Sequence, residues 1–334
     1  MTTPARSAAA ASSPAIPPPI EADLARVEER LAVELGSRET RLTAIASHLV
    51  GAGGKRVRPS VVLLAFHAAA ASGGSGRRRD DAVEAAVALE LIHSATLLHD
   101  DIIDGSETRR GKPSALAAFG AADTLVAGDF LFSRAFALCA RFEAEVVRWA
   151  AEACISLTEG EVMQGRFRHN PTVTAADYRE IIARKTASLF AAGARTAAHL
   201  AGAPAEVVEA MRSCGHHVGL AFQMSDDLLD VAGHPAATGK PRGIDLRDGN
   251  PSLPIVLALA GDPELSRLFA NRRLAPSDVE SGLARIRRSG VLRAVADEAR
   301  RHVAAAAADV ARLAPSPYRA ALEVLIQGIA ERDS

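Results

Sequence analysis

The sequence has few of the residues on which β-rich, disulfide-bonded and metal-module proteins depend. Aromatic residues make up 4% of its 334 residues, with one Trp and two Tyr, which disfavours a β-rich architecture. The three cysteines, at positions 139, 154 and 214, form neither a CxxC pair nor a Cys/His pattern, which excludes a disulfide scaffold and a zinc module. No uninterrupted apolar run reaches the roughly 18 residues that a membrane-spanning helix needs.

An excess of one charge is also missing. The chain has 39 Lys and Arg against 40 Asp and Glu, a net charge of −1, so no bulk positive field attracts nucleic acid or an anionic membrane. We therefore expect no nucleic-acid partner, and charge-based chemistry must come from local clusters. The cysteine usage and the lack of a compact secretory signal predict a cytoplasmic location.

Helix-forming Ala, Leu, Arg and Glu dominate what is present. Residues 1–20 are rich in Ala, Ser and Pro and predict a disordered tail, with a transit peptide as the alternative. Residues 21–334 predict one all-α domain. Gly, Pro and Asn signals separate the predicted helices, which cover residues 21–35, 38–51, 59–72, 80–104, 113–118, 121–140, 143–165, 174–184, 186–202, 204–232, 252–260, 263–271, 276–288, 290–313 and 316–331.

A first aspartate cluster, Asp100, Asp101 and Asp104, ends a long apolar helix. Positions i and i+4 share a helical face, so Asp100 and Asp104 project together. They repel each other and lie near a helix C-terminus, where negative charge is unfavourable. A divalent cation such as Mg²⁺ would neutralise them and bridge to substrate phosphates. A solvated acidic helix end is the simpler reading of this cluster taken alone.

A second aspartate cluster repeats this spacing with Asp226, Asp227 and Asp230. It lies inside another apolar helical run, so its carboxylates cannot all face solvent. If the two helices face one cavity, six carboxylates converge there. Such a cage would be strongly unfavourable without cations. It predicts binding of several Mg²⁺ ions and, through them, a diphosphate.

Basic residues provide a counterpart to the two aspartate clusters. Arg and Lys are the usual phosphate ligands, although each one alone is most simply a solvated surface charge. Together with the two aspartate clusters they predict two phosphorylated ligands, one held through metal and one through basic side chains. The basic candidates are Lys55, Arg56, Arg58, Arg109, Arg110, Lys185, Lys240 and Arg242.

From about residue 40 to its C-terminus, the sequence closely resembles the trans-isoprenyl diphosphate synthases, or polyprenyl synthetase family, of the medium- and long-chain type. The resemblance rests on GGKRVRP, ELIHSATLLHDDIIDGSETRRGKPS, GDFLFSRAF, EGEVMQG, RKTASLF, FQMSDDLLD and GKPRGIDL, in that order. It implies an all-α, single-domain isoprenoid synthase bundle around a deep central cavity, usually as a homodimer. It also implies head-to-tail condensation of isopentenyl diphosphate with an allylic diphosphate.

The resemblance also implies roles for individual residues. The metal ligands would be Asp100, Asp104, Asp226 and Asp230, holding three Mg²⁺ ions per active site. The catalytic set would be Asp100, Asp101, Asp104, Lys185, Asp226 and Asp227. Isopentenyl diphosphate would contact Lys55, Arg58, His93 and Arg110. The allylic diphosphate would contact Arg109, Lys185, Thr186, Gln223 and Lys240, with Thr186 at the reacting centre.

One departure from the family pattern follows the second aspartate cluster. The family commonly has Lys and Thr where this chain has Asn250 and Ser252. By this resemblance, the chain lacks one cationic contact to the allylic diphosphate that the family commonly has. We expect a weaker grip on that substrate but retained activity.

The helical face that leads back from Asp100 carries Ala95, Thr96 and Ile92, and these residues are our candidates for the floor that limits the product. Relatives with short products have a bulky aromatic residue near the position of Ala95. Because Ala95 and Thr96 are small, we predict a product longer than C20. The alternative is a geranylgeranyl (C20) diphosphate synthase, with the floor set by Ile92 or by another helix.

Two other functions remain open at this point. A class I terpene cyclase would share the fold, but it would need neither the GGKRVRP segment and His93 nor a complete second aspartate cluster. A silent partner subunit of a heteromeric synthase would typically have lost its aspartate clusters, and this chain keeps both. A long product would be handed to membrane enzymes.

Overall fold

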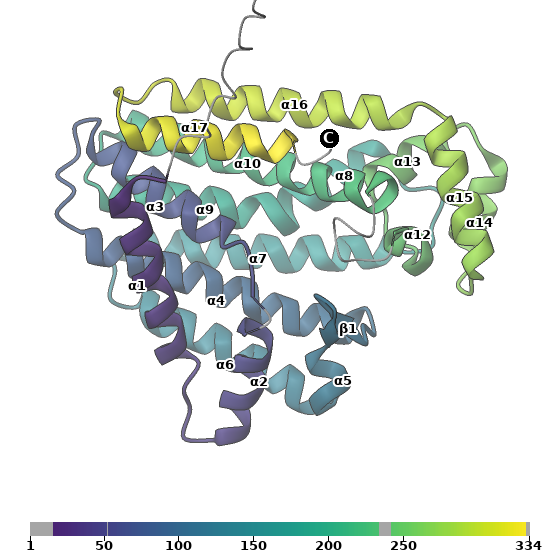
Figure 1. The fold of residues 1–334 in the computed structure, drawn as a ribbon, viewed down its shortest axis with the longest axis horizontal. Helices are drawn as coiled ribbons and strands as arrows, with labels where there is room; N and C mark the ends of the chain where they lie inside the picture. The colour runs from purple at the N-terminus through teal and green to yellow at the C-terminus, as the bar shows by residue number, and fades with distance from the viewer. Residues whose placement is uncertain (1–15, 52, 234–241, 332–334) are drawn as a thin grey trace, which may run out of the picture.

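A computed structural model describes residues 16–51, 53–233 and 242–331, and Figure 1 shows their arrangement. Helices dominate, and a small antiparallel hairpin pairs β1 (Thr108–Arg109) with β2 (Lys112–Pro113). The α-helices are α1 (Pro18–Glu34), α2 (Thr40–Val50), α3 (Val57–Ala70), α4 (Arg79–Ile103), α5 (Ala115–Phe119), α6 (Ala121–Cys139), α7 (Ala144–Phe167), α8 (Ala175–Ile182), α9 (Ser188–Leu200), α10 (Ala205–Ala232), α12 (Ile244–Asp248), α13 (Leu253–Leu259), α14 (Pro263–Ala270), α15 (Pro276–Arg288), α16 (Val291–Val310) and α17 (Pro317–Ala330).

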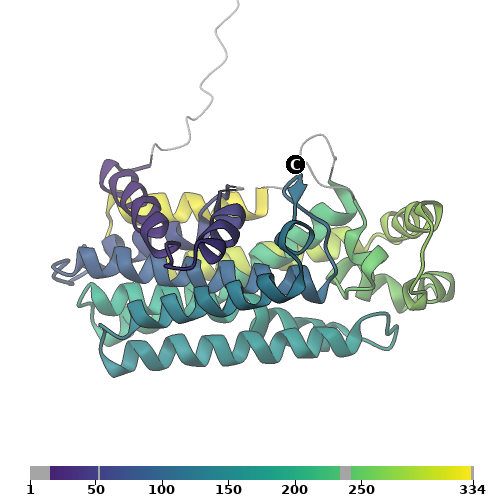
Figure 2. The same cartoon turned by 90° about the horizontal axis from the view of Figure 1, so that it is seen from below.

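The long helices run side by side along the longest axis of the molecule, as the view from below shows (Figure 2). Helix α10 packs against α9 and α16, α4 packs against α6 and α3, and α7 packs against α9. Helices α1 and α2 lie across this bundle, and α14 and α15 cover one end (Figure 1). The predicted all-α fold is confirmed.

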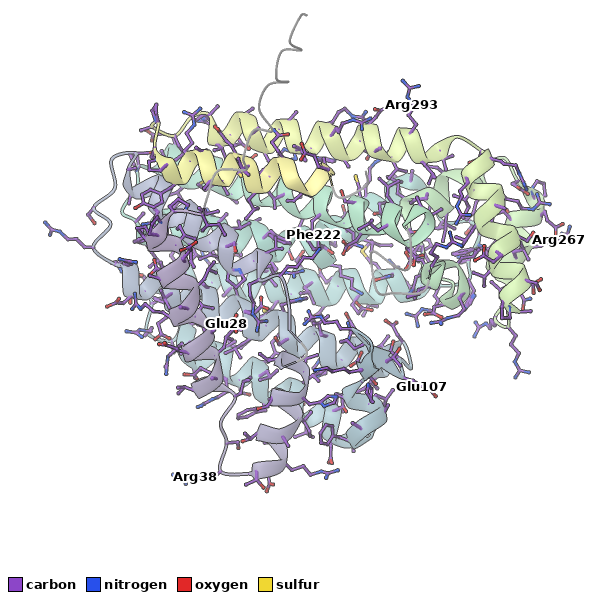
Figure 3. The ribbon with its side chains drawn as sticks, in the orientation of Figure 1. Glu28, Arg38, Glu107, Phe222, Arg267 and Arg293 are labelled. Carbon is purple, nitrogen blue, oxygen red and sulfur yellow. The ribbon has the colours of Figure 1, made fainter. Side chains whose placement is uncertain are left out.

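Two apolar cores hold the bundle together, and α10 passes through both. Its first half contributes Met211 and Val218 to the larger core, while Met224 and Val231 belong to the smaller core with α8 and α13–α16. Phe222, close to the change of core, is partly buried against the larger core, whereas the labelled arginines project outward (Figure 3). The second aspartate cluster therefore lies on a helix that is fixed on both sides.

The predicted long helices agree closely with the structure. The predictions 80–104 and 204–232 correspond to α4 and α10, because both are long apolar segments with Gly or Pro signals close to their ends. The first helix begins earlier than predicted, at Pro18, and Ile20 is buried. The end of the predicted tail over 1–20 is therefore helical, while residues 1–15 lie outside the described part of the chain.

The largest local difference lies between α8 and α9. We predicted a break near residue 185, but a π-helix, η1 (Ala183–Ala187), connects the two helices without a gap. Short π segments inside α-helical runs frequently mark functional sites. The β1–β2 hairpin and α12 were not predicted either.

Helix α4 has the length and apolar composition of a membrane span, and 67% of the relevant window is buried inside the protein. Core helices of soluble proteins pass the same test, so this observation is weak evidence for membrane insertion. Glu84 and Glu90 interrupt the apolar sequence of α4, so the expectation that no uninterrupted apolar run reaches this length still holds.

A buried carboxylate ties α1 to α3 and α4. Asp23 is fully buried and accepts hydrogen bonds from Arg79 Nε at 2.9 Å and from His67 Nε2 at 2.8 Å. Burial acts to raise its pKa, but the bonds from His67 and Arg79 outweigh that effect and lower the pKa below its usual value. The His67 ring also stacks on Tyr318 of α17, with centroids 4.7 Å apart.

We expect Asp23→Asn to destabilise the fold by about 3 kcal/mol, because breaking a buried ion pair leaves its partners uncompensated. Urea unfolding of this variant and of Asp80→Asn, whose side chain is 82% exposed, measures the difference. Since the folded pKa of Asp23 is lowered, its contribution should be present at neutral pH and be lost as the pH falls through the acid range. Equal stability of Asp23→Asn and the parent would contradict this role.

Candidate active site

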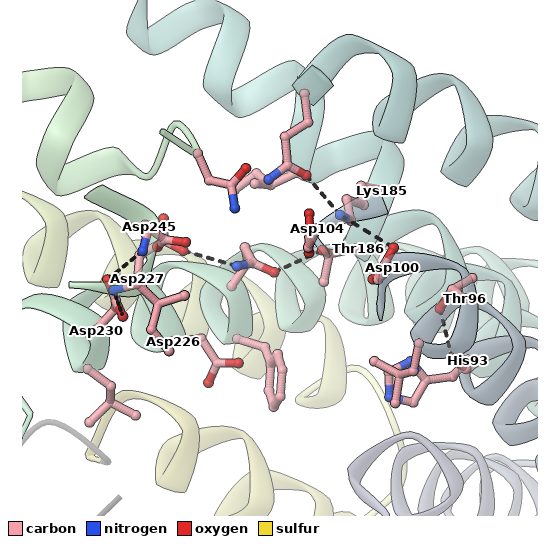
Figure 4. Close-up of a pocket in the computed structure, with 18 of the residues that line it drawn as sticks. His93, Thr96, Asp100, Asp104, Lys185, Thr186, Asp226, Asp227, Asp230 and Asp245 are labelled. Atoms are coloured by element: carbon pink, nitrogen blue, oxygen red, sulfur yellow. Dashed lines mark hydrogen bonds and ion pairs between the residues drawn. The ribbon is translucent and has the colours of Figure 1, made fainter. Parts of the chain in front are cut away.

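One cavity of about 1860 Å³ opens between α4, η1, α10 and α12. It exceeds the roughly 300–1,000 Å³ of a pocket for a drug-sized ligand. Asp100 and Asp104 of the first aspartate cluster line it, as do Asp226, Asp227 and Asp230 of the second. Figure 4 shows Asp226, Asp227, Asp230 and Asp245 gathered on one side and Asp100, Asp104 and Lys185 on the other.

The three residues of the first aspartate cluster lie in two different environments. Asp100 and Asp104 face the cavity at the end of α4. Asp101 is fully buried and accepts a hydrogen bond of 2.7 Å from Arg109 Nε on β1. Arg109 itself also lines the cavity. Asp101 therefore holds the hairpin and its arginine against α4.

Lys185 lies across the cavity from α4, on η1. Its Nζ is 4.0 Å from Asp100 Oδ1 and 2.8 Å from Gln164 Oε1, and it pairs with Glu161. Burial raises the pKa of Asp100 to about 6, because the attraction of Lys185 only partly offsets it and Glu161 adds repulsion. A cation beside Asp100 would relieve this cost.

The second aspartate cluster is held by hydrogen bonds from several elements. Asp227 accepts from Tyr178 Oη at 2.5 Å, from Gln223 Nε2 at 3.0 Å and from the Leu253 N–H at 3.0 Å. Burial raises the pKa of Asp227 to about 7, against these bonds. Both oxygens of Asp227 are thus engaged by protein donors, so the structure favours a positioning role for this residue.

Asp230 and Asp226 complete the second cluster. Asp230 accepts from the backbone N–H groups of Ile244 and Asp245, at 3.0 and 3.2 Å, and so fixes the start of α12. Both Asp226 and Asp230 line the cavity. The expected convergence of six carboxylates is therefore only partly right, since Asp101 and Asp227 are held by protein donors and each oxygen of Asp230 also accepts one backbone N–H.

The residues predicted to hold isopentenyl diphosphate all line the cavity, and Arg58 and Arg110 lie close enough to His93 to act on its charge. We call this set the basic wall: Lys55, Arg58, His93 and Arg110. Arg58 lies over the Phe190 ring at 4.8 Å, and its buried Nε has no hydrogen-bond partner among the described residues. Burial and the neighbouring arginines hold the pKa of His93 well below its usual value. The wall thus offers a neutral imidazole and an unsatisfied guanidinium donor.

Backbone strain accompanies the basic residues. Arg56 and Arg110 have φ angles of 47° and 52°, in the left-handed region that is uncommon for residues other than glycine. Such conformations cluster at functional sites, where the surroundings fix them. Arg56 itself pairs with Glu28 and Glu90, the latter at 2.9 Å, so it anchors the segment that carries Arg58.

The three remaining residues predicted to contact the allylic diphosphate, and the two positions that depart from the family pattern, have different outcomes. Thr186 donates to Gln223 Oε1 at 3.0 Å, and both line the cavity. Lys240 lies outside the described residues. Asn250 lines the cavity, whereas Ser252 is buried behind it and its hydroxyl has no partner in the described part of the chain.

Only one of the three predicted floor residues lies on the cavity wall. Thr96 lines the cavity, as does its neighbour Leu97, while Ala95 and Ile92 are buried in the larger core and are absent from the described lining. The wall follows the face of His93, Thr96, Leu97 and Asp100, and Ala95 and Ile92 lie on the adjoining face. This corrects their expected position.

The sequence reasoning missed several residues of the site. Asp245 lines the cavity, and its pKa is raised well above the usual value by burial and then by Asp230 and Asp227. Tyr178 also lines the cavity and donates to Asp227. The GKPRGIDL segment was a visible signal for Asp245. The pairing of Tyr178 has no such signal, because it depends on the packing of α8 against α10.

The donor set suits magnesium without forming a complete protein cage. Among the described residues no group of three His, Cys, Asp or Glu side chains is close enough to hold a metal by itself. Mg²⁺ usually binds through one or two carboxylates, waters and substrate phosphates. Carboxylate oxygens along one cavity come from Asp100, Asp104, Asp226 and Asp230. Burial raises the pKa of Asp100, and a bound cation would offset the cost of its buried negative charge. The residues therefore fit the ion.

A helical bundle whose aspartate clusters and basic wall share one cavity has the features of an enzyme that transfers groups from diphosphates. Comparison with known proteins identifies which one: the polyprenyl synthetase family model matches residues 39–285, so the chain belongs to that family. It is therefore a prenyltransferase. The resemblance drawn from the sequence motifs is confirmed.

Individual relatives span several product lengths. The chain is 36% identical to octaprenyl diphosphate synthase of Escherichia coli (strain K12), covering 74% of this chain and 75% of that protein. It is 35% identical to geranylgeranyl diphosphate synthase of Methanosarcina mazei, covering 80% and 82%. A crystal structure of polyprenyl synthase from Caulobacter crescentus CB15, complexed with calcium and isoprenyl diphosphate, is 38% identical with a TM-score of 0.88, covering 94% of this chain and 96% of that chain.

Close packing of α7 against η1 positions Lys185. Adding one methyl group at Gly160 of α7 tests this packing. A Cβ on Gly160 of α7 would lie 2.5 Å from the Lys185 backbone N, whereas a Cβ on Gly165 meets no described atom within 4 Å. We expect Gly160→Ala to lower stability by about 1–3 kcal/mol through overpacking and to reduce turnover. Gly165→Ala should be neutral or slightly stabilising. Thermal unfolding and a prenyl-transfer assay compare the two, and equal behaviour would exclude this packing constraint.

Proposed function

We propose that this prenyltransferase uses the cavity as a magnesium-dependent site that condenses isopentenyl diphosphate with an allylic diphosphate, giving an all-trans product longer than C20. The observation that carries this proposal is the shared cavity of both aspartate clusters and the basic wall. One region offers carboxylates for metal-bound diphosphate, and another offers cationic donors for a second diphosphate. Two diphosphate substrates need both regions.

The allylic diphosphate would bind along the two aspartate clusters. Asp100, Asp104, Asp226 and Asp230 would hold magnesium, which when bound supplies positive charge to the leaving diphosphate. Lys185 pairs with Glu161 and lies 4.0 Å from Asp100. Its ammonium would add a fixed charge beside the same oxygens. We propose three ions per site, as the family resemblance implies.

Isopentenyl diphosphate would bind on the basic wall. The Arg58 Nε has no hydrogen-bond partner among the described residues and the His93 ring is neutral, so both can donate to a diphosphate held without metal. Thr186 and Gln223, which line the cavity and hydrogen-bond to each other, would orient the reacting ends. The double bond of isopentenyl diphosphate would attack the allylic carbon as the bond from that carbon to its diphosphate breaks. The departing diphosphate would then take the proton released.

Apolar side chains continue the cavity beyond the diphosphate region. Leu97, Phe132, Leu157 and Leu189 line it. A dry wall of this kind protects a carbocation from capture by water, and it accepts a growing prenyl chain. It therefore supports the condensation on physical grounds.

Removing either metal-binding cluster should abolish most activity. We expect Asp100→Ala and Asp226→Ala each to lower the rate of labelled isopentenyl diphosphate incorporation by about three decades, or about 4 kcal/mol of transition-state stabilisation. Asp297→Ala, on the exposed side of α16, serves as the control. Near-normal turnover by either active-site variant would rule out the proposed metal site.

The two rival functions are separated by the choice of substrates and subunits. A terpene cyclase would release hydrocarbon from an allylic diphosphate alone, whereas a synthase needs isopentenyl diphosphate as well. A silent partner subunit would show no activity when purified alone. The retained clusters and the basic wall favour a self-sufficient synthase.

Product length should depend on Thr96, because it is the predicted floor residue on the cavity wall. We expect Thr96→Phe to shorten the main product by at least one isoprene unit, while Thr96→Val, of similar size, leaves it unchanged. Mass spectrometry of the dephosphorylated products, with C10, C15 and C20 starters, makes the comparison. An unchanged product from Thr96→Phe would place the limiting contact elsewhere.

We also propose a cytoplasmic homodimer that passes its product to membrane enzymes. Helices α6 and α7 support a dimer, because Leu125, Val126, Ile155 and Val162 are about half exposed or more on them. A cluster of large apolar side chains on neighbouring helices is typical of an association surface. The family resemblance implies the same assembly.

A further inference from the structure

Arg168 follows α7 directly and joins two parts of the site that are far apart in the chain. Its Nε donates to Asn250 Oδ1 at 3.0 Å, its Nη1 donates to the Ile103 carbonyl at 3.3 Å, and its Nη2 pairs with Asp104. Asp104 and Asn250 both line the cavity. The guanidinium therefore connects the end of α4 to the loop between α12 and α13.

The next residue binds the same loop through a separate contact. The His169 N–H donates to the Gly249 carbonyl at 2.9 Å, and its ring is so close that a Cβ on Gly249 would lie 2.2 Å from Nδ1. His169 has a φ of 57°, in the left-handed region. A conformation of this kind persists where the surroundings fix it. Residues 168–169 thus form a fixed junction.

The pairing leaves part of Asp104 available. Arg168 binds Oδ1, and no donor among the described residues binds Oδ2. The two side chains are only 23% and 25% exposed, so the pair is better shielded than an exposed surface ion pair. Arg168 therefore fixes the Asp104 carboxylate while one of its oxygens stays free for a ligand.

Position 250 adds a constraint on charge. Asn250 is neutral and accepts a hydrogen bond from Arg168, and the two polar atoms are 3.0 Å apart. A second cation at position 250 would repel the guanidinium at that distance. This corner of the site therefore accommodates one positive charge, and in this chain it comes from α7.

We propose that Arg168 is a positioning residue of the allylic-diphosphate site, which orients Asp104 for magnesium and supplies the positive charge that Asn250 lacks. The inference rests on the proposed function. Arg168 acts through Asp104 and Asn250, so its effect should appear in metal and allylic-substrate binding more than in the chemical step.

The first test compares Arg168→Gln with Arg166→Gln, an exposed arginine in the last turn of α7. With inorganic pyrophosphate present, we expect the Mg²⁺ concentration for half-maximal thermal stabilisation to rise about tenfold in Arg168→Gln, the scale for losing a partner of a metal ligand. KM for the allylic diphosphate should rise similarly. KM for isopentenyl diphosphate and kcat at saturating Mg²⁺ should change little, and Arg166→Gln should match the parent.

The second test uses the charge at position 250. Asn250→Lys should weaken pyrophosphate-dependent Mg²⁺ binding in the parent, where two cations meet, but should restore binding in the Arg168→Gln background. Arg168→Lys keeps the positive charge but loses the planar guanidinium that bonds to two partners at once. Its pyrophosphate-dependent Mg²⁺ binding should lie between that of the parent and that of Arg168→Gln. Circular dichroism without ligand checks folding, and if Arg168→Gln does not fold, Arg168→Lys and Asn250→Lys in the parent decide the question.

Unchanged Mg²⁺ dependence in Arg168→Gln, or an Asn250→Lys effect of the same size and sign in both backgrounds, would overturn the proposal. Failure of the proposed function would give a different result from failure of this inference. In that case the parent protein would not condense the two diphosphates at all, whereas Mg²⁺ and pyrophosphate binding would still report on Arg168.

Discussion

The structure depends on keeping several carboxylates around one cavity without letting their repulsion open the bundle. Each carboxylate is stabilised by a different set of partners. Asp101 is neutralised by Arg109, Asp104 by Arg168, and Asp227 is held by Tyr178 and a backbone N–H. Where compensation is incomplete, the pKa rises, to about 6 for Asp100 and about 7 for Asp227. The site is thus prepared to gain stability from bound cations.

Much of the surrounding architecture serves those pairings. The π-helix η1 brings Lys185 and Thr186 to the cavity. Helices α7 and α10 approach η1 closely at Gly160 and Gly219. The β1–β2 hairpin carries Arg109 back to α4. Helix α10 is anchored in both apolar cores, so the second aspartate cluster has little freedom to withdraw from the first.

The sequence predicted the parts that depend on local periodicity. The ends of α4 and α10, and the shared cavity of the two aspartate clusters, follow from apolar spacing and repeated motifs. The family motifs also selected the basic wall correctly as cavity-lining residues. What repeated spacing could not supply was the set of partners that each carboxylate finds in the folded chain.

Three features required the folded structure. The η1 segment depends on close packing at two glycines, which no helix pattern encodes. Arg168 follows α7 in an unremarkable charged stretch, and its importance comes from contacts with Asp104 and Asn250. The predicted floor was misplaced because α4 is apolar on most of its faces, so spacing alone did not decide whether Ala95 or Thr96 faces the cavity.

The most direct test of the central claim is a crystal structure of the protein with Mn²⁺, as an anomalous substitute for Mg²⁺, and inorganic pyrophosphate. The account predicts metal peaks bridging one pyrophosphate to carboxylates of both aspartate clusters, Asp100 and Asp104 on one side and Asp226 on the other. Metal and pyrophosphate bound at one cluster alone, with the other cluster still closed on its protein partners, would contradict it.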